Sequence, residues 1–133
     1  MPKPIVLLLL AIAGFSIGGL VFGASYSEWM LPGGLPFGNL LAATGLCSLA
    51  GLAFSLAPPA SMRRRVSRLA LFAAILWLPL SIVLAGNLAL NFSGVRGTIW
   101  FALSSATAIT ALGALLCAVV GLLFGSRGKT SAG

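Results

Sequence analysis

The chain consists of four long apolar stretches separated by short segments that hold most of its charged residues. The stretches cover approximately residues 5–23, 37–57, 69–90 and 99–124, and none of them contains a charged side chain. About 20 consecutive apolar residues are enough for a helix to cross a bilayer. The stretches do not alternate between apolar and polar positions, as the strands of a membrane barrel do. The pattern predicts an all-α integral membrane protein in which residues 1–133 form one transmembrane domain, an up-down bundle of four helices.

Two features modify this division. The first stretch also resembles a secretory signal peptide, because Lys3 gives it a basic start and residues 21–23 offer an imperfect cleavage site. We expect it to be retained as a helix. Pro58 and Pro59 end the second stretch because neither has an amide donor, and Pro79 is expected to kink the third helix.

Charged residues are scarce and unevenly distributed. They make up 7% of the chain, against 59% hydrophobic residues. If the chain crosses the membrane four times, seven of its eight basic residues fall on one side, and only Arg96 and the single acid, Glu28, fall on the other. Cytoplasmic loops collect Lys and Arg. We therefore expect both termini in the cytoplasm, and we assign the protein to the bacterial cytoplasmic (inner) membrane.

Half of the basic residues form one cluster between the second and third stretches: Arg63, Arg64, Arg65 and Arg68. A strongly basic chain can indicate nucleic-acid binding, but the predicted topology itself requires positive charge here, so we expect no nucleic-acid partner. A further role of the cluster would be to bind anionic lipid head groups, at about 1 kcal/mol per basic residue, or an acidic partner loop. At the opposite interface, Trp29 and Trp100 are predicted to be membrane anchors.

Small residues recur at four-residue steps in three of the stretches. This spacing lets helix backbones approach closely in lipid, where packing and hydrogen bonds drive association. The predicted helix-packing residues are Gly14, Gly18, Gly19, Gly23, Ala43, Cys47, Gly51, Ser55, Gly113, Cys117, Gly121 and Gly125. A second row in the fourth stretch contains Ala106, Thr110, Ala114 and Ala118. The third stretch shows no comparable row, so we expect it to face lipid or a partner.

Two further patterns allow alternative interpretations. Residues 46–54 match residues 116–124 at five of nine positions, which fits either a duplicated helical hairpin or a chance similarity between sequences of low complexity. Residues 24–36 are apolar for an external loop, and their glycines and prolines exclude a long helix. We expect this segment to lie at the membrane interface, either as a turn resting on lipid or as a gate or docking edge.

The chain offers little reactive chemistry. It contains no His, no Asp, one Glu and two isolated Cys. Metal and haem sites need clusters of such ligands, and acid–base catalysis needs a positioned proton acceptor. We therefore predict no catalytic residue, no metal site, no cofactor and no enzymatic activity. The stretches also lack the acidic residue that marks proton relays within a membrane.

Polar residues within the stretches would serve either as an uncharged path for a solute or as hydrogen-bonding groups between helices: Asn39, Thr44, Ser48, Ser81, Asn87, Thr107 and Thr110. We favour the second interpretation. It describes a small non-catalytic accessory, assembly or stabilising subunit of a larger membrane complex. Its partners would be membrane lipid and other integral membrane subunits or further copies of itself. The alternative is a small homo-oligomeric channel or transporter for a neutral or anionic solute, which would require these residues to converge on a wet cavity.

Overall fold

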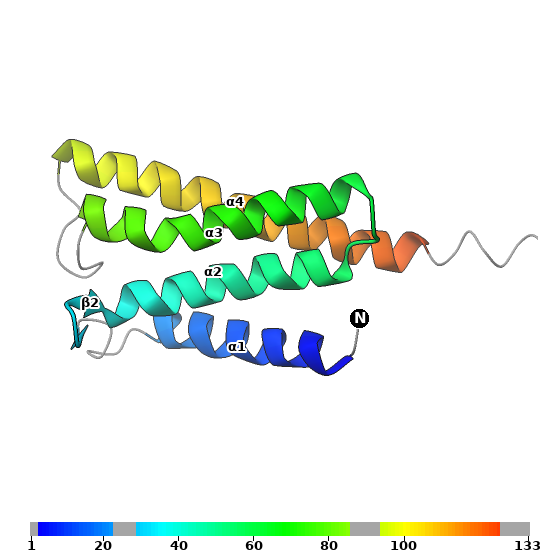
Figure 1. The fold of residues 1–133 in the computed structure, drawn as a ribbon, viewed down its shortest axis with the longest axis horizontal. Helices are drawn as coiled ribbons and strands as arrows, with labels where there is room; N and C mark the ends of the chain where they lie inside the picture. The colour runs from blue at the N-terminus through cyan, green and yellow to red at the C-terminus, as the bar shows by residue number, and fades with distance from the viewer. Residues whose placement is uncertain (1–2, 23–28, 86–93, 126–133) are drawn as a thin grey trace, which may run out of the picture.

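In the computed structural model, which describes residues 3–22, 29–85 and 94–125, the chain forms four long helices and a small hairpin. The helices are α1 (Lys3–Val21), α2 (Phe37–Leu56), α3 (Met62–Ala85) and α4 (Gly94–Gly125). Successive helices run in opposite directions along a common axis (Figure 1). All four are long and apolar enough to cross a membrane. The predicted all-helical architecture with four long apolar helices is therefore confirmed.

The segment before α2 folds into an antiparallel hairpin that the sequence analysis did not predict. Its strands are β1 (Met30–Leu31) and β2 (Leu35–Pro36), which pair along their full length. The two glycines of the turn have φ angles of +88° and +79°, in the region that glycine enters without steric cost. The Phe37 amide donates a 2.8 Å hydrogen bond to the Trp29 carbonyl oxygen. This bond fixes the hairpin at the start of α2.

α3 begins at Met62 instead of residue 69, so the whole arginine cluster is helical. The sequence prediction excluded charged residues from the apolar spans and therefore began the helix too late. Ser61 explains the earlier start, because its hydroxyl accepts a 3.2 Å hydrogen bond from the Arg64 amide, as an N-cap residue does. Pro79 lies inside α3, which continues on both sides of it.

α2 occupies the centre of the molecule. It contacts each of the other helices, whereas α1 packs chiefly against α2 (Figure 1). α2, α3 and α4 contact one another and form a three-helix core. The share of buried residues was compared over the most apolar part of these helices. It is 44% for α2 and 28% for α3, but only 11% for α1. α3, which we expected to face outward, is thus a core helix, and α1 is the peripheral one.

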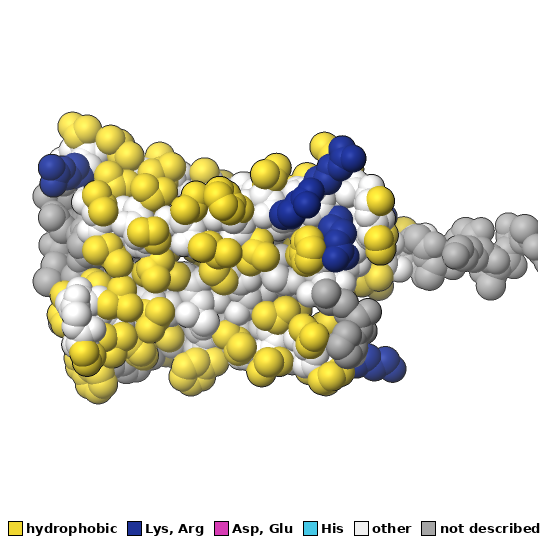
Figure 2. All heavy atoms as spheres, in the orientation of Figure 1, with side chains coloured by type: hydrophobic (Ala, Val, Ile, Leu, Met, Phe, Trp, Pro, Cys, Tyr) yellow, Lys and Arg dark blue, Asp and Glu magenta, His cyan; other side chains and the backbone are white. Residues whose placement is uncertain are grey.

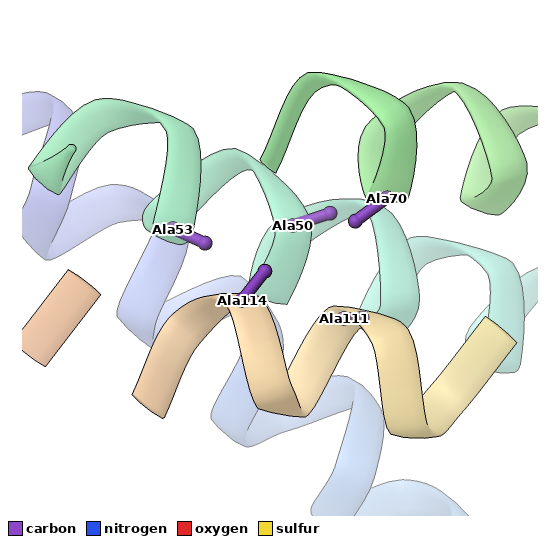
Figure 3. Packing of buried hydrophobic residues seen from close by; sticks show 5 residues of the cluster. All are labelled: Ala50, Ala53, Ala70, Ala111 and Ala114. Carbon is purple, nitrogen blue, oxygen red and sulfur yellow. The ribbon is translucent and has the colours of Figure 1, made fainter. Parts of the chain in front are cut away.

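One half of the three-helix core is built from alanines, here called the alanine cluster: Ala50 and Ala53 of α2, Ala70 of α3, and Ala111 and Ala114 of α4. Figure 3 shows the methyl groups of Ala50 and Ala70 pointing toward each other, with Ala114 directed into the same space. These positions are 0–3% exposed. Methyl groups at the contact allow three helix backbones to approach closely, which favours association in lipid.

Small residues also bring α1 onto α2. Ser16 is buried, and a Cβ atom built on Gly45 would lie 3.4 Å from the Ser16 Cβ. One turn and a half further along α2, the Leu9 side chain packs over Gly51, 3.6 Å from the position that a Cβ would take. The contact between these helices is therefore close and leaves little room for larger side chains at Gly45.

Candidate functional site

The other half of the three-helix core contains a group of polar and indole side chains that hydrogen-bond to one another. We call it the tryptophan–serine cluster: Asn39 of α2, Trp77 and Ser81 of α3, and Trp100 and Ser104 of α4. The Ser81 hydroxyl accepts hydrogen bonds from Asn39 Nδ2 at 3.1 Å and from Trp100 Nε1 at 2.8 Å. Trp77 Nε1 donates to the Ser104 hydroxyl at 2.8 Å. These bonds link all three core helices.

Most of the cluster is buried, but Ser104 is half-buried. A groove of about 230 Å³ reaches Trp77 and Ser104 from one side. Asn39 is 0% exposed, Ser81 1% and Trp77 4%. The two indole rings lie 6.4 Å apart between centroids and are inclined by 57°, a separation within the range that aromatic pairs prefer. Ala43 belongs to the same buried cluster as the two rings. Within the described ranges, every buried side-chain nitrogen or oxygen atom has a hydrogen-bond partner, so the polar groups of the cluster are used internally.

The cluster fixes the positions of the helices and offers no chemistry of its own. The side-chain amide, hydroxyl and indole groups do not ionise near neutral pH. They are therefore poorly suited to act as the general acid or base of a reaction. Their physical effect is directional, because each hydrogen bond selects one register and one rotation of the helices that it joins. The arrangement therefore specifies how α2, α3 and α4 fit together.

The residues of the predicted polar path lie in several places. Asn39 and Ser81 meet in the tryptophan–serine cluster, and Ser48 is buried in α2. The threonines each donate a hydrogen bond of 2.7–2.8 Å to the carbonyl oxygen four residues earlier in their own helix: Thr44, Thr107 and Thr110. Asn87 lies outside the described residues. Among the described members of the set, only Asn39 and Ser81 hydrogen-bond to each other, and they do so within a filled core.

Sequence reasoning missed the role of Trp77 and placed Trp100 elsewhere. Trp100 was predicted to be an interface anchor, but it is 8% exposed and lies inside the core. A detectable signal was present in α3, in a row of mostly small residues at alternating steps of three and four: Ser67, Ala70, Ala74, Trp77 and Ser81. This spacing is the period of helices that pack along a seam, and all five residues are buried.

Several of the predicted helix-packing residues contact another helix. Ala43 of α2 shares a buried cluster with the indole rings of α3 and α4, and Gly51 lies under Leu9. The Arg63 guanidinium of α3 lies directly over Gly121 of α4, in the space that a side chain there would take. Three members are half-buried: Gly19, Cys47 and Ser55. Gly125 ends α4, and Gly23 lies outside the described residues.

Other members of the same set face away from the bundle. A Cβ atom built on Gly14, Gly18 or Gly113 would meet no atom of residues 3–22, 29–85 or 94–125 within 4 Å. Cys117 is exposed on α4. Beside Gly14 and Gly18 is an apolar groove of about 550 Å³, which aromatic side chains of α1, the hairpin and α2 also line. Trp29, the other predicted interface anchor, belongs to this groove and is exposed.

The basic residues gather at one end of the bundle. Five of the six that the structure describes lie at the end opposite the hairpin, where α1 begins and α2 joins α3 (Figures 1 and 2). They are Lys3, Arg63, Arg64, Arg65 and Arg68. Arg96 lies at the other end, near the start of α4. The chain's single acid, Glu28, falls outside the described residues.

Comparisons with known proteins give no match that bears on these features. No protein-family model, curated protein or solved structure matches the chain significantly. Among residues 3–22, 29–85 and 94–125, no group of three His, Cys, Asp or Glu side chains is placed to hold a metal ion.

Proposed function

We propose that the protein is a non-catalytic accessory subunit that stabilises or helps to assemble a larger complex in the bacterial inner membrane. In this proposal all four helices cross the bilayer, and the arginine end faces the cytoplasm. The three-helix core forms a self-contained unit, and α1 presents the surface that binds the partner subunit. The chain contributes no reacting group of its own.

The observation that carries the proposal is the uncovered glycine face of α1. Glycine inside a helix costs about 1 kcal/mol relative to alanine, so a pair of glycines is best explained by a close contact that requires them. Gly14 and Gly18 have no such contact with the residues that the structure describes, and among these a Cβ atom would fit freely at either position. Small residues one turn apart let a second helix approach closely in lipid, and the adjoining groove would accept side chains of that helix.

Two features favour this role over that of a channel. The core polar groups are hydrogen-bonded to one another around two indole rings, so they are not aligned along an open path. Thr107 and Thr110 are the members of the predicted polar path on α4. Their hydroxyl groups donate hydrogen bonds to carbonyl groups of their own helix. A channel would therefore need a path formed between copies of the chain.

The test is purification of the tagged full-length chain from its native membrane in mild detergent, followed by mass measurement of the particle. We expect a larger membrane protein at fixed stoichiometry with this chain. The double variant Gly14→Leu/Gly18→Leu fills the glycine face, so it should reduce the recovered partner at least tenfold while the purified chain keeps its melting temperature within about 2 °C, since surface substitutions change stability little.

The matched control places two leucines on an exposed part of α4, in Ala102→Leu/Ala106→Leu. This variant should retain the partner. Equal loss of the partner in both variants would reject α1 as the binding surface. A discrete homo-oligomer without any other subunit would contradict the accessory role itself and favour the channel.

A further inference from the structure

A polar cavity lies at the arginine end of the bundle, where α2 joins α3. Its volume is about 330 Å³, and it is lined by Phe54, Ala60, Ser61, Arg64, Arg65 and Arg68. Three guanidinium groups therefore surround one small space. No carboxylate of the described residues balances them, because the only acid in the chain is Glu28, which is not among those residues.

Arg64 is held in place by α2 rather than left to move in solvent. Its guanidinium lies 4.1 Å from the centre of the Phe54 ring, a distance typical of cation–π contacts. Its Nη1 atom also donates a 3.3 Å hydrogen bond to the carbonyl oxygen of Ala57, just past the end of α2. The side chain is thus fixed with its charge at the edge of the cavity.

Arg65 and Arg68 complete the charged wall. They are three residues apart in α3, so their side chains emerge from the same face of the helix, and both are exposed. Arg65 also lies at the end of the first turn of α3, where the helix dipole favours anions. An anion in the cavity would therefore be attracted by the guanidinium groups and by the end of α3 together.

The exposed face of α3 changes from basic to apolar directly beyond the cavity. Leu69, Phe72 and Leu76 follow Arg65 along one side of the helix, at steps of four, three and four residues. Their side chains are 67%, 62% and 42% exposed. Figure 2 shows basic side chains at this end of the molecule and hydrophobic surface next to them. A ligand lying along this face would need an anionic head and an apolar chain.

We propose that this cavity binds the phosphate-bearing head group of an anionic phospholipid, whose acyl chain lies along Leu69, Phe72 and Leu76. Arginine suits this ligand because its guanidinium forms paired hydrogen bonds with phosphate oxygens. Arg65 and Arg68 bind the phosphate, while Arg64, held by Phe54 and the Ala57 carbonyl, orients the site. The inference rests on the proposed membrane insertion, but not on the partner subunit.

The experiment uses the full-length protein in vesicles and then in mixed micelles. Retention in phosphatidylcholine vesicles after an alkaline wash is measured first, and release by the wash would contradict membrane insertion itself. The retained protein is then titrated with phosphatidylglycerol against a phosphatidylcholine background, and bound lipid is counted by native mass spectrometry. We expect one phosphatidylglycerol molecule to be held selectively.

Variants locate the binding site. Arg65→Gln/Arg68→Gln should weaken phosphatidylglycerol binding about thirtyfold, because each basic residue near anionic lipid contributes about a factor of five. The control variant Lys3→Gln/Arg96→Gln removes the same amount of charge outside the cavity. Of these two residues only Lys3 lies at the arginine end, so phosphatidylglycerol binding should weaken about fivefold or less. Equal losses in the two variants, or no preference for phosphatidylglycerol in a properly inserted protein, would overturn the inference.

A soluble competitor identifies the source of the phosphate. Glycerol phosphate carries a similar charged group without an acyl chain, so we expect millimolar concentrations to leave the bound lipid in place. Displacement of the lipid by glycerol phosphate at such concentrations would show a site for a soluble phosphate compound, which contradicts a lipid site. Leu69→Ala/Phe72→Ala should weaken lipid binding without changing the affinity of the lipid-free protein for glycerol phosphate.

Discussion

The same three helices are joined by the alanine cluster in one half of the core and by the tryptophan–serine cluster in the other. In the alanine cluster small methyl side chains meet, flanked by leucine and valine side chains, and the helices are held by close contact of their surfaces. In the tryptophan–serine cluster two indole rings fill the space between the helices, and three hydrogen bonds cross from helix to helix. The first half fixes how close the helices lie, and the second fixes their register.

The difference explains why both kinds of contact occur in one small bundle. Lipid chains are as apolar as leucine, so burial of apolar surface alone does not distinguish one packing of membrane helices from another. Methyl contacts tolerate some sliding of one helix along the next, whereas a hydrogen bond in an apolar environment does not, because a displaced polar group loses its partner. The following substitutions separate the two contributions.

The largest effect is expected for Trp77→Ala. This change removes a side chain that is 4% exposed and leaves a cavity between α3 and α4, and it also deprives the Ser104 hydroxyl of its donor. Replacing a buried tryptophan by alanine costs about 3–5 kcal/mol. Reversible unfolding by denaturant in micelles measures this loss. Trp29→Ala, at an exposed position, is the control and should leave the unfolding free energy almost unchanged.

A smaller loss, about 2 kcal/mol, is expected for Ala50→Leu. Ala50 is completely buried and faces Ala70 (Figure 3), so a larger side chain must push α2 and α3 apart. Ala106→Leu adds the same atoms at an exposed position of α4 and serves as the control. If both variants unfold at the same denaturant concentration, close packing in the alanine cluster does not limit stability.

The smallest effect is expected for Ser81→Ala, about 1 kcal/mol, because hydrogen bonds between membrane helices contribute about 0.6 kcal/mol each on average. Ser81 accepts two such bonds, from Asn39 and Trp100. A double-mutant cycle that combines Ser81→Ala with Asn39→Ala isolates the coupling energy between Asn39 and Ser81. This energy should be about 0.5 kcal/mol and favourable. Additive losses in this cycle would mean that the Asn39–Ser81 bond contributes nothing to the register of α2 and α3.

Sequence reasoning predicts the helices of this molecule better than their contacts. Length and hydropathy are properties of each stretch, so the four helices follow directly from the chain. The glycine rows were visible too, but a four-residue spacing indicates only that a face admits a close neighbour. It does not say whether that neighbour belongs to the same chain, and Gly14 and Gly51, in the same predicted set, differ in this respect.

Asn39 and Ser81 were among the residues expected to hydrogen-bond between helices, but the pairings within the tryptophan–serine cluster could not be predicted. Trp77 and Ser104 belong to different helices, and only their relative rotation turns an indole and a hydroxyl into a hydrogen bond. Trp100 lies near a helix end, where an indole is commonly a membrane anchor. Its burial depends on Ser81, 19 residues earlier in the chain, which provides the acceptor within the core.

The order in which the ribosome delivers the helices has a consequence for the tryptophan–serine cluster. Asn39 and Ser81 can pair as soon as α3 lies beside α2, but Ser104 arrives only with α4, which is made after α3. Until then the Trp77 indole lacks its acceptor. A chain truncated before α4 therefore carries an unfinished core, with an indole donor that gains its acceptor only when α4 packs against α3.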